Sequence, residues 1–333
     1  MDFSRKNYDE IVSSVSATLK ENSEWLSRYS KYGTAIIKNT ETIQTIKKNF
    51  RQWAPLYLYM NITEAKSSMK FQLRYRGQRV AEIFRRGEKI LISTSGLDEK
   101  NKRDFGCTIT LSNVEWTSSE ATGFRKHFRS NPVRSGKSPK NNEEHRVESM
   151  LLSEFEKKAS SGKSVISIQP VKVAQIARFQ MPTPFRGSDA KNIKYANSNG
   201  GGIDILCRIG KGKGTRLCVI EVKDENVASE PPTAAIKQAL IYGTFIIELL
   251  RSKSGQVWWE IFGFSGKLPK AITLAIACAM PYSKTADASF EGHIVNLGND
   301  RIELHSLFFD EHDNMISKIR TSIPQCIASS EKG

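Results

Sequence analysis

The stretch GGIDILCRIGKGKGTRLCVIEVK, residues 201–223, holds two apolar runs joined by a loop of lysines and glycines. The apolar runs are typical of buried strands, and the loop between them is typical of a hairpin turn. Charged residues nevertheless lie in these runs, with Asp204 near the beginning and Glu221 and Lys223 near the end. A charge is costly to bury unless it is paired or binds an ion, so these three residues call for a functional explanation.

The pattern predicts how the two strands pair. With the loop centred between Gly212 and Lys213, an antiparallel hairpin places Asp204 opposite Glu221 and leaves only apolar pairs on the other face. A shift of one residue would mix the two faces, so the alternation favours this register. Opposed side chains have Cβ atoms about 4.5–5.5 Å apart, where two ionised carboxylates repel each other unless a cation lies between them.

Carboxylate oxygens suit a hard divalent ion, so we expect Mg²⁺ or Mn²⁺ at this position. Lys223 lies two residues after Glu221, and strand alternation therefore places its ammonium on the same face as the two acids. There it could orient an attacking water and neutralise charge on a phosphate, while the ion lowers the pKa of the water. A solvated Asp/Glu/Lys cluster on a strand is the alternative interpretation of the same residues.

This constellation resembles the PD-(D/E)XK (restriction endonuclease-like) nuclease superfamily over about residues 143–282. In that superfamily an acid on the first helix, an Asp on the second core strand and a (D/E)xK on the third hold metal ions and hydrolyse phosphodiesters. The resemblance implies that the metal ligands are Asp204, Glu221, Val222 and Glu148, with Lys223 as a catalytic residue. Glu144, one turn before Glu148, competes for the helix position, and the Pro that precedes the Asp in the superfamily is Ile203 here.

A second part of the resemblance lies in KQALIYG, residues 237–243, which looks like the Gln-x-x-x-Tyr signature of some branches of the superfamily. Gln238 and Tyr242 are four residues apart and would share one face of a helix. The resemblance implies that Gln238 is catalytic and that Tyr242 braces the site or contacts nucleic acid. A core tyrosine beside a surface glutamine is the alternative.

The predicted fold class is α/β, with a restriction endonuclease-like core of mixed β-sheet flanked by helices and an amino-terminal α+β domain. Helical spacing over residues 6–50 is followed by an antiparallel meander from Trp53 to Thr94, in which Phe71, Leu73 and Tyr75 face a core. Composition predicts four segments: a basic domain at 1–128, a linker at 129–142, the nuclease domain at 143–326 and a tail at 327–333.

The chain carries 50 Lys and Arg against 35 Asp and Glu, a formal net charge of +15, which favours a polyanionic partner such as nucleic acid. The meander and the linker region concentrate this charge. The predicted nucleic-acid contacts are Arg74, Arg76, Arg79, Arg125, Lys126 and Arg129. A solvated basic sheet face is the alternative.

Five cysteines without a CxxC pair, and a charged amino terminus, predict a cytoplasmic protein with no disulfide framework. The apolar stretches are shorter than a membrane span, so no membrane partner is expected. The predicted activity is that of a Mg²⁺-dependent DNA endonuclease, by analogy in phage defence or restriction. A non-cleaving nucleic-acid-binding or assembly subunit of the same fold is the alternative. An RNA substrate, a homodimer and a partner protein of a multi-component system remain open.

Overall fold

The computed structural model describes residues 5–49, 54–62, 70–135, 140–157, 168–173, 176–186, 194–197, 200–223, 231–282, 288–313 and 315–324. The chain divides into two compact units. The first unit comprises Met1–Ser30, Val147–Val171 and Gln180–Gly333, and the second comprises Lys31–Arg146 and Lys172–Phe179. Both contain helices and strands, which confirms the predicted α/β class.

The units are not the consecutive domains 1–128 and 143–326 that composition predicts. Residues 1–30 belong with the carboxyl-terminal part because helix α1 (Arg5–Glu21) packs against α7 (Pro232–Arg251). Regular structure also extends to both ends of the predicted linker, since α5 (Ser119–Arg129) ends at its first residue and α6 (Lys140–Glu156) begins inside it. Local composition does not report packing between distant segments. The predicted tail, 327–333, lies outside the described residues.

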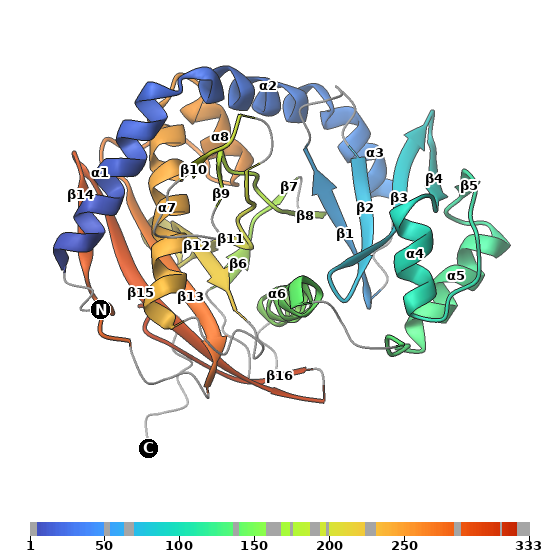
Figure 1. Ribbon diagram of the computed structural model, residues 1–333. Helices are drawn as coiled ribbons and strands as arrows, with labels where there is room; N and C mark the ends of the chain where they lie inside the picture. Colours follow the sequence, from blue (N-terminus) through green and yellow to red (C-terminus); the bar gives the residue numbers. More distant parts are fainter. Residues whose placement is uncertain are drawn as a thin grey trace. The chain divides into compact units, whose positions relative to one another are not determined.

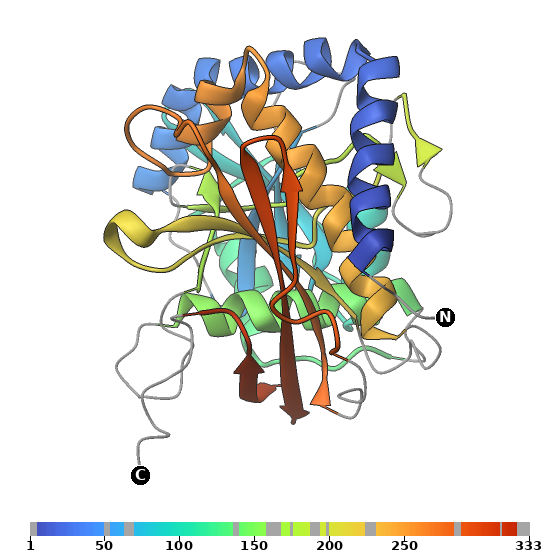
Figure 2. The same ribbon diagram turned by 90° about the vertical axis from the view of Figure 1, so that its left-hand side faces the viewer.

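The first unit is built on a mixed sheet in the order β14-β15-β13-β12-β11-β6, with β16 paired to β15. The strands are β6 (Ile168–Pro170), β11 (Ile205–Ile209), β12 (Arg216–Val222), β13 (Thr273–Pro281), β14 (Ile294–Leu297), β15 (Asp300–His312) and β16 (Met315–Thr321). β6, β11 and β12 pair antiparallel, whereas β12, β13 and β15 run parallel. The carboxyl ends of these three parallel strands therefore lie at one end of the sheet and their amino ends at the other (Figure 2).

Helix α7 is the core helix of this unit. It touches β13 so closely that a Cβ atom on Gly243 would meet Ile276 Cγ2 at 2.7 Å. With 20 residues, α7 is long and apolar enough to cross a membrane, whereas the apolar run in the sequence was predicted to be too short. Inside the protein 78% of that stretch is buried, as expected of a core helix. α1 lies beside it (Figures 1 and 2).

Aromatic packing holds further helices of the first unit around α7. Tyr29, at the beginning of α2 (Glu24–Lys38), lies 4.9 Å from Phe245 between ring centroids, and Trp25 lies 5.8 Å from the same ring. The indole nitrogen of Trp258, in α8 (Gly255–Ile261), donates to the carbonyl of Tyr29 at 3.2 Å. The short hairpin of β9 (Phe185–Arg186) and β10 (Lys194–Tyr195) completes the regular structure of this unit.

The second unit contains the predicted meander, because β1, β2, β3 and β4 pair in sequence order and antiparallel. Phe71, Leu73 and Tyr75 are at most 1% exposed, as expected of core residues. β8 extends the sheet by pairing parallel to β1, and β7 and β5 lie at its two edges. The remaining elements are α3 (Thr40–Asn49), β1 (Leu56–Asn61), β2 (Lys70–Tyr75), β3 (Gln78–Arg86), β4 (Lys89–Ser93), α4 (Leu97–Asp104), β5 (Val114–Glu115), β7 (Lys172–Val173) and β8 (Ala177–Phe179).

Candidate metal centre

The hairpin of β11 and β12 has the predicted register. Ile205 lies opposite Ile220 and Cys207 opposite Cys218, so the two positions of each pair sum to 425, as they would for Asp204 and Glu221. A single turn of 3-10 helix, Gly212–Gly214, closes the loop between the strands. The alternation of apolar and polar residues was therefore sufficient to align the strands.

Asp204 differs in detail from the predicted pairing, because β11 begins one residue later, at Ile205. Its side chain turns toward the partner strand, where Oδ2 accepts the backbone N–H of Val222 at 2.9 Å. This bond fixes the Asp204 carboxylate beside the last residues of β12. The carboxylate is half-buried.

Glu221 and Lys223 lie at the carboxyl end of β12 and are both buried, at 2% and 6% exposure. The Lys223 ammonium donates to Glu221 Oε1 at 3.0 Å, which confirms that the two side chains share a face. The backbone N–H of Lys223 donates to the carbonyl of Ala279 at 2.9 Å, so the chain stays hydrogen-bonded to β13 beyond the end of the strand. The contact places opposite charges side by side, which opposes the cost of burying each of them.

A chain of hydrogen bonds connects Lys223 to α7. Lys223 Nζ donates to Gln238 Oε1 at 3.2 Å, and Gln238 Nε2 donates to the Tyr242 hydroxyl oxygen at 3.3 Å. Burial raises the pKa of Tyr242 above its usual value, and the negative charge of Glu221 raises it further. Tyr242 therefore remains a neutral phenol. Because it is only 1% exposed, it can brace the site, whereas the predicted contact with nucleic acid is not open to it.

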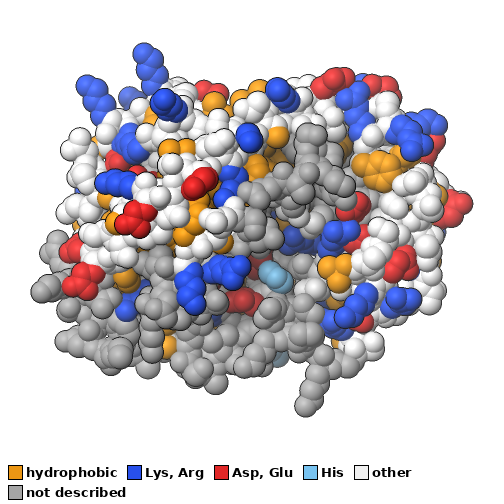
Figure 3. Space-filling model, turned by 45° about the horizontal axis from the view of Figure 1, so that its top comes forward, with side chains coloured by type: hydrophobic (Ala, Val, Ile, Leu, Met, Phe, Trp, Pro, Cys, Tyr) orange, Lys and Arg blue, Asp and Glu red, His pale blue; other side chains and the backbone are white. Residues whose placement is uncertain are grey.

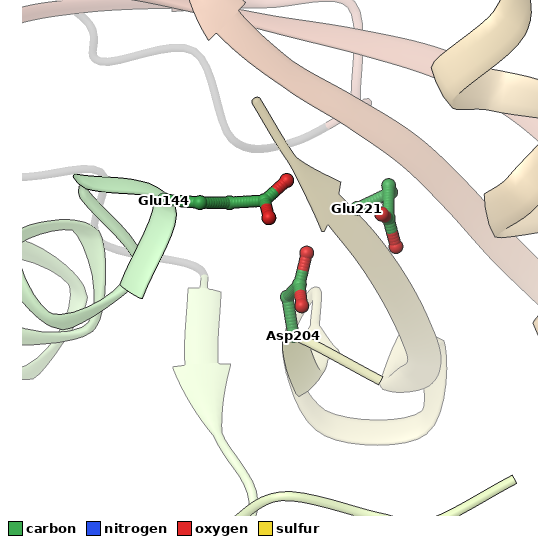
Figure 4. Close-up of side chains that lie close together, drawn as sticks. All are labelled: Glu144, Asp204 and Glu221. Carbon is green, nitrogen blue, oxygen red and sulfur yellow. The ribbon is translucent and has the colours of Figure 1, made fainter. Parts of the chain in front are cut away.

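Three carboxylates converge at this point. Oxygens of Glu144, Asp204 and Glu221 all lie within 4.8 Å of one another, and these side chains point toward a common centre in Figure 4. Within the described ranges this is the one group of three or more acidic, His or Cys side chains that close together. Oxygen-only ligands with room for water are the donor set that Mg²⁺ and Mn²⁺ prefer, so the residues fit the expected ion.

The helix acid of this group is Glu144, the competitor of the predicted Glu148. Both residues lie on α6, which is a single continuous helix through the division between the two units. Glu148 is one turn further along and only 2% exposed, and it does not belong to the three-carboxylate group. Val222, the remaining predicted ligand, has an apolar and fully buried side chain, so it can offer only its backbone carbonyl.

The glycines before Asp204, which the sequence argument did not use, position that residue. Gly200, Gly201 and Gly202 thread past residues 181–185 with backbone hydrogen bonds at Gly201 and Ile203. A Cβ atom on Gly201 would lie 2.5 Å from the Tyr242 hydroxyl, and one on Gly200 would lie 1.8 Å from the Thr183 carbonyl oxygen. No side chain fits there. The run of three glycines directly before Ile203 was the available signal.

The predicted nucleic-acid contacts occupy varied positions in the second unit. Arg79 is bound to Asp98, which is fully buried, and Arg125 is 6% exposed and donates to the backbone carbonyl of Trp116. Burial lowers the pKa of Arg125. The structure thus gives these two arginines partners inside the unit.

The other four differ among themselves. Arg74 donates to Gln72 and lies over the Tyr59 ring, and Arg76 lies over the Tyr75 ring. Lys126 and Arg129 are exposed. Lys and Arg side chains are interspersed with Asp and Glu over the face seen in Figure 3, so net charge alone does not mark a binding surface.

No protein-family model, curated protein or solved structure matches this chain.

Proposed function

We propose that this protein is a divalent-metal-dependent nuclease that hydrolyses phosphodiester bonds in DNA. The observation that carries the proposal is the convergence of Asp204, Glu221 and Lys223 at the carboxyl end of β12. Burying Glu221 and Lys223 beside the half-buried Asp204 carboxylate costs free energy that a structural role would not require. A hard divalent ion among the carboxylates offsets that cost and gives the arrangement a use.

The order of elements supports the same proposal. α6 carries the acid, and β6, β11 and β12 are the next strands of the large sheet, with β7 to β10 lying outside that sheet between β6 and β11; α7 and α8 then precede β13. Asp204 directly precedes the second of these strands, and Glu221 and Lys223 lie at the end of the third. This succession is similar to the layout of the PD-(D/E)XK superfamily, in which the same three positions hold the metal and the catalytic lysine.

A Mg²⁺ or Mn²⁺ ion bound by Asp204, Glu221 and Glu144 would polarise a phosphoryl oxygen and lower the pKa of a water. Lys223 supplies positive charge next to Glu221, where it can orient the attacking water and neutralise charge on the phosphate. Gln238 keeps the ammonium in place through its amide oxygen. Tyr242, protonated and buried, keeps Gln238 in place in turn.

The test is incubation of the purified protein with supercoiled, linear, single-stranded and branched DNA, and with RNA, in Mg²⁺, Mn²⁺ and EDTA. We expect cleavage of DNA in either metal and none in EDTA. Cleavage that persists in EDTA, or no cleavage of any substrate by metal-loaded protein, would overturn the proposal. Metal binding and DNA binding without cleavage would indicate a non-cleaving subunit, and cleavage restricted to RNA would correct the substrate.

A further inference from the structure

The end of the sheet remote from the metal centre is rich in Lys and Arg side chains. Four segments meet at the amino ends of the parallel strands: residues 208–216, 251–256, 262–272 and 297–301, here called the basic end. In Figure 2 the β11–β12 turn reaches outward on the left, and the segment between α8 and β13 lies above it. All four segments belong to the first unit.

Hydrogen bonds join these segments into one surface. Arg208 Nη1 donates to the carbonyl of Gly263 at 2.5 Å, which links the β11–β12 hairpin to the segment after α8. Arg251 Nη1 donates to the carbonyl of Pro269 at 2.9 Å, and its guanidinium also binds Asp300, which links the same segment to the β14–β15 turn. These hydrogen bonds therefore hold the segments in fixed positions relative to one another.

The basic end has a large excess of positive charge. Its four segments contain nine Lys and Arg residues and one acid, Asp300, which Arg251 already binds. The arginines bond to the protein itself, as Arg208 and Arg251 do, and Arg216 pairs with Glu303. The lysines are instead exposed: Lys211, Lys213, Lys253, Lys267 and Lys270. Among the described residues none of these five lysines has an acid within ion-pair distance.

One of these segments, residues 262–272, also carries an aromatic ring beside two of the lysines in the sequence. Phe264 is half-exposed and stacks on Trp259 with ring centroids 3.8 Å apart and an angle of 13° between the planes. Lys267 follows three residues later in the same segment. Lysines and an aromatic ring on one segment are suited to nucleic acid, in which phosphates alternate with bases that stack on aromatic side chains.

We propose that the basic end binds the DNA strand at a distance from the phosphate that is cut, a proposal that rests on the proposed nuclease function. β12 separates the two ends, from Arg216 to Val222. At about 3.3 Å per residue these positions are ~20 Å apart. Because DNA rises about 3.4 Å per base, the basic end reaches phosphates roughly six bases from the cut. The lysines thus set the length of DNA that the protein uses.

The experiment compares two double variants, Lys211→Gln/Lys213→Gln and Lys267→Gln/Lys270→Gln, with the wild-type protein. Binding of a fluorescent 30-base-pair duplex is measured in EDTA from 50 to 200 mM KCl. Loss of two phosphate contacts is expected to reduce the slope of log K against log salt by about 1.8 and to weaken binding about tenfold at the upper salt concentration.

A matched control, Lys47→Gln/Lys48→Gln, removes two exposed lysines from α3 in the other unit. Unchanged affinity and salt slope in both basic-end variants, or an equal loss in the control, would overturn the proposal. Because binding is measured without metal, the two proposals fail separately. Lysine-dependent binding without any cleavage contradicts the nuclease function alone, and cleavage without lysine dependence contradicts the role of the basic end alone.

Discussion

Charged side chains are buried at one end of the sheet of the first unit and exposed at the other. At the carboxyl end of β12 the charged side chains of Glu221 and Lys223 are buried and bonded to each other. At the amino end Lys211 and Lys213 are exposed on a glycine-rich turn. Buried charge demands fixed partners, whereas exposed charge acts at long range and is screened by salt. The comparison indicates a precise chemical site at one end and an adaptable electrostatic surface at the other.

The largest effect is expected at the buried end. Asp204→Asn retains an oxygen for the Val222 N–H but removes the negative charge that would bind the ion, so we expect cleavage to fall about 10³-fold. Plasmid cleavage and calorimetric titration with Mn²⁺ measure the two consequences. Asp9→Asn, an exposed aspartate on α1, is the matched control. Retention of both metal binding and cleavage in Asp204→Asn would contradict the assignment of the metal site to the carboxyl end of β12.

Gly201, three residues before Asp204, tests whether close packing positions that carboxylate. Gly201→Ala would place a methyl group 2.5 Å from the Tyr242 hydroxyl, displace Asp204 and lower the cleavage rate about 10²-fold. Adding Tyr242→Phe removes the clashing oxygen but also the hydrogen bond that holds Gln238, so the double variant should recover part of the rate.

Gly123→Ala serves as the control, because its Cβ atom would meet nothing closer than 3.6 Å. A Gly201→Ala variant with the wild-type rate, or a folded double variant as slow as the single one, would show that this contact does not position Asp204.

The choice of helix acid has a smaller expected effect. Glu144→Gln removes one charged ligand from the three-carboxylate group and should weaken Mn²⁺ binding about tenfold. Glu148→Gln, one turn away on the same helix, should weaken it less. Calorimetry on the two variants decides between them, and the reverse order would make Glu148 the ligand that the superfamily resemblance implied.

The smallest effect concerns stability at the exposed end. Lys211→Gln/Lys213→Gln should change the free energy of unfolding by less than about 0.5 kcal/mol, because no buried partner is lost. Lys223→Met should lower it by about 3 kcal/mol, because Glu221 would remain buried without its ammonium. Urea unfolding of both variants measures the contrast, and equal losses would contradict it.

Features that depend on local alternation could be predicted from the sequence. The register of β11 and β12 follows from which residues are apolar, and it places Glu221 and Lys223 on one face without further information. The meander of the second unit is predictable for the same reason.

Features that depend on packing between distant segments could not be predicted. Helical periodicity puts Glu144 and Glu148 on the same face, so only the position of α6 along its axis distinguishes them. The need for glycine at position 201 arises only when Tyr242 on α7 is in place. The burial of Arg125 is likewise hidden from its sequence neighbourhood, because a run of basic residues is equally typical of a linker.

The central claim is that Asp204, Glu221 and Lys223 form a metal-dependent site that hydrolyses phosphodiesters. The most direct measurement is the single-turnover rate of supercoiled plasmid cleavage in Mg²⁺ by the wild-type protein and by Lys223→Ala, with DNA affinity measured in parallel and exposed Lys20→Ala as control. We expect Lys223→Ala to lose cleavage by 10²-fold or more, about the value of one lost charge-stabilising donor, while its DNA affinity stays within twofold. Cleavage by Lys223→Ala at the wild-type rate would contradict the claim.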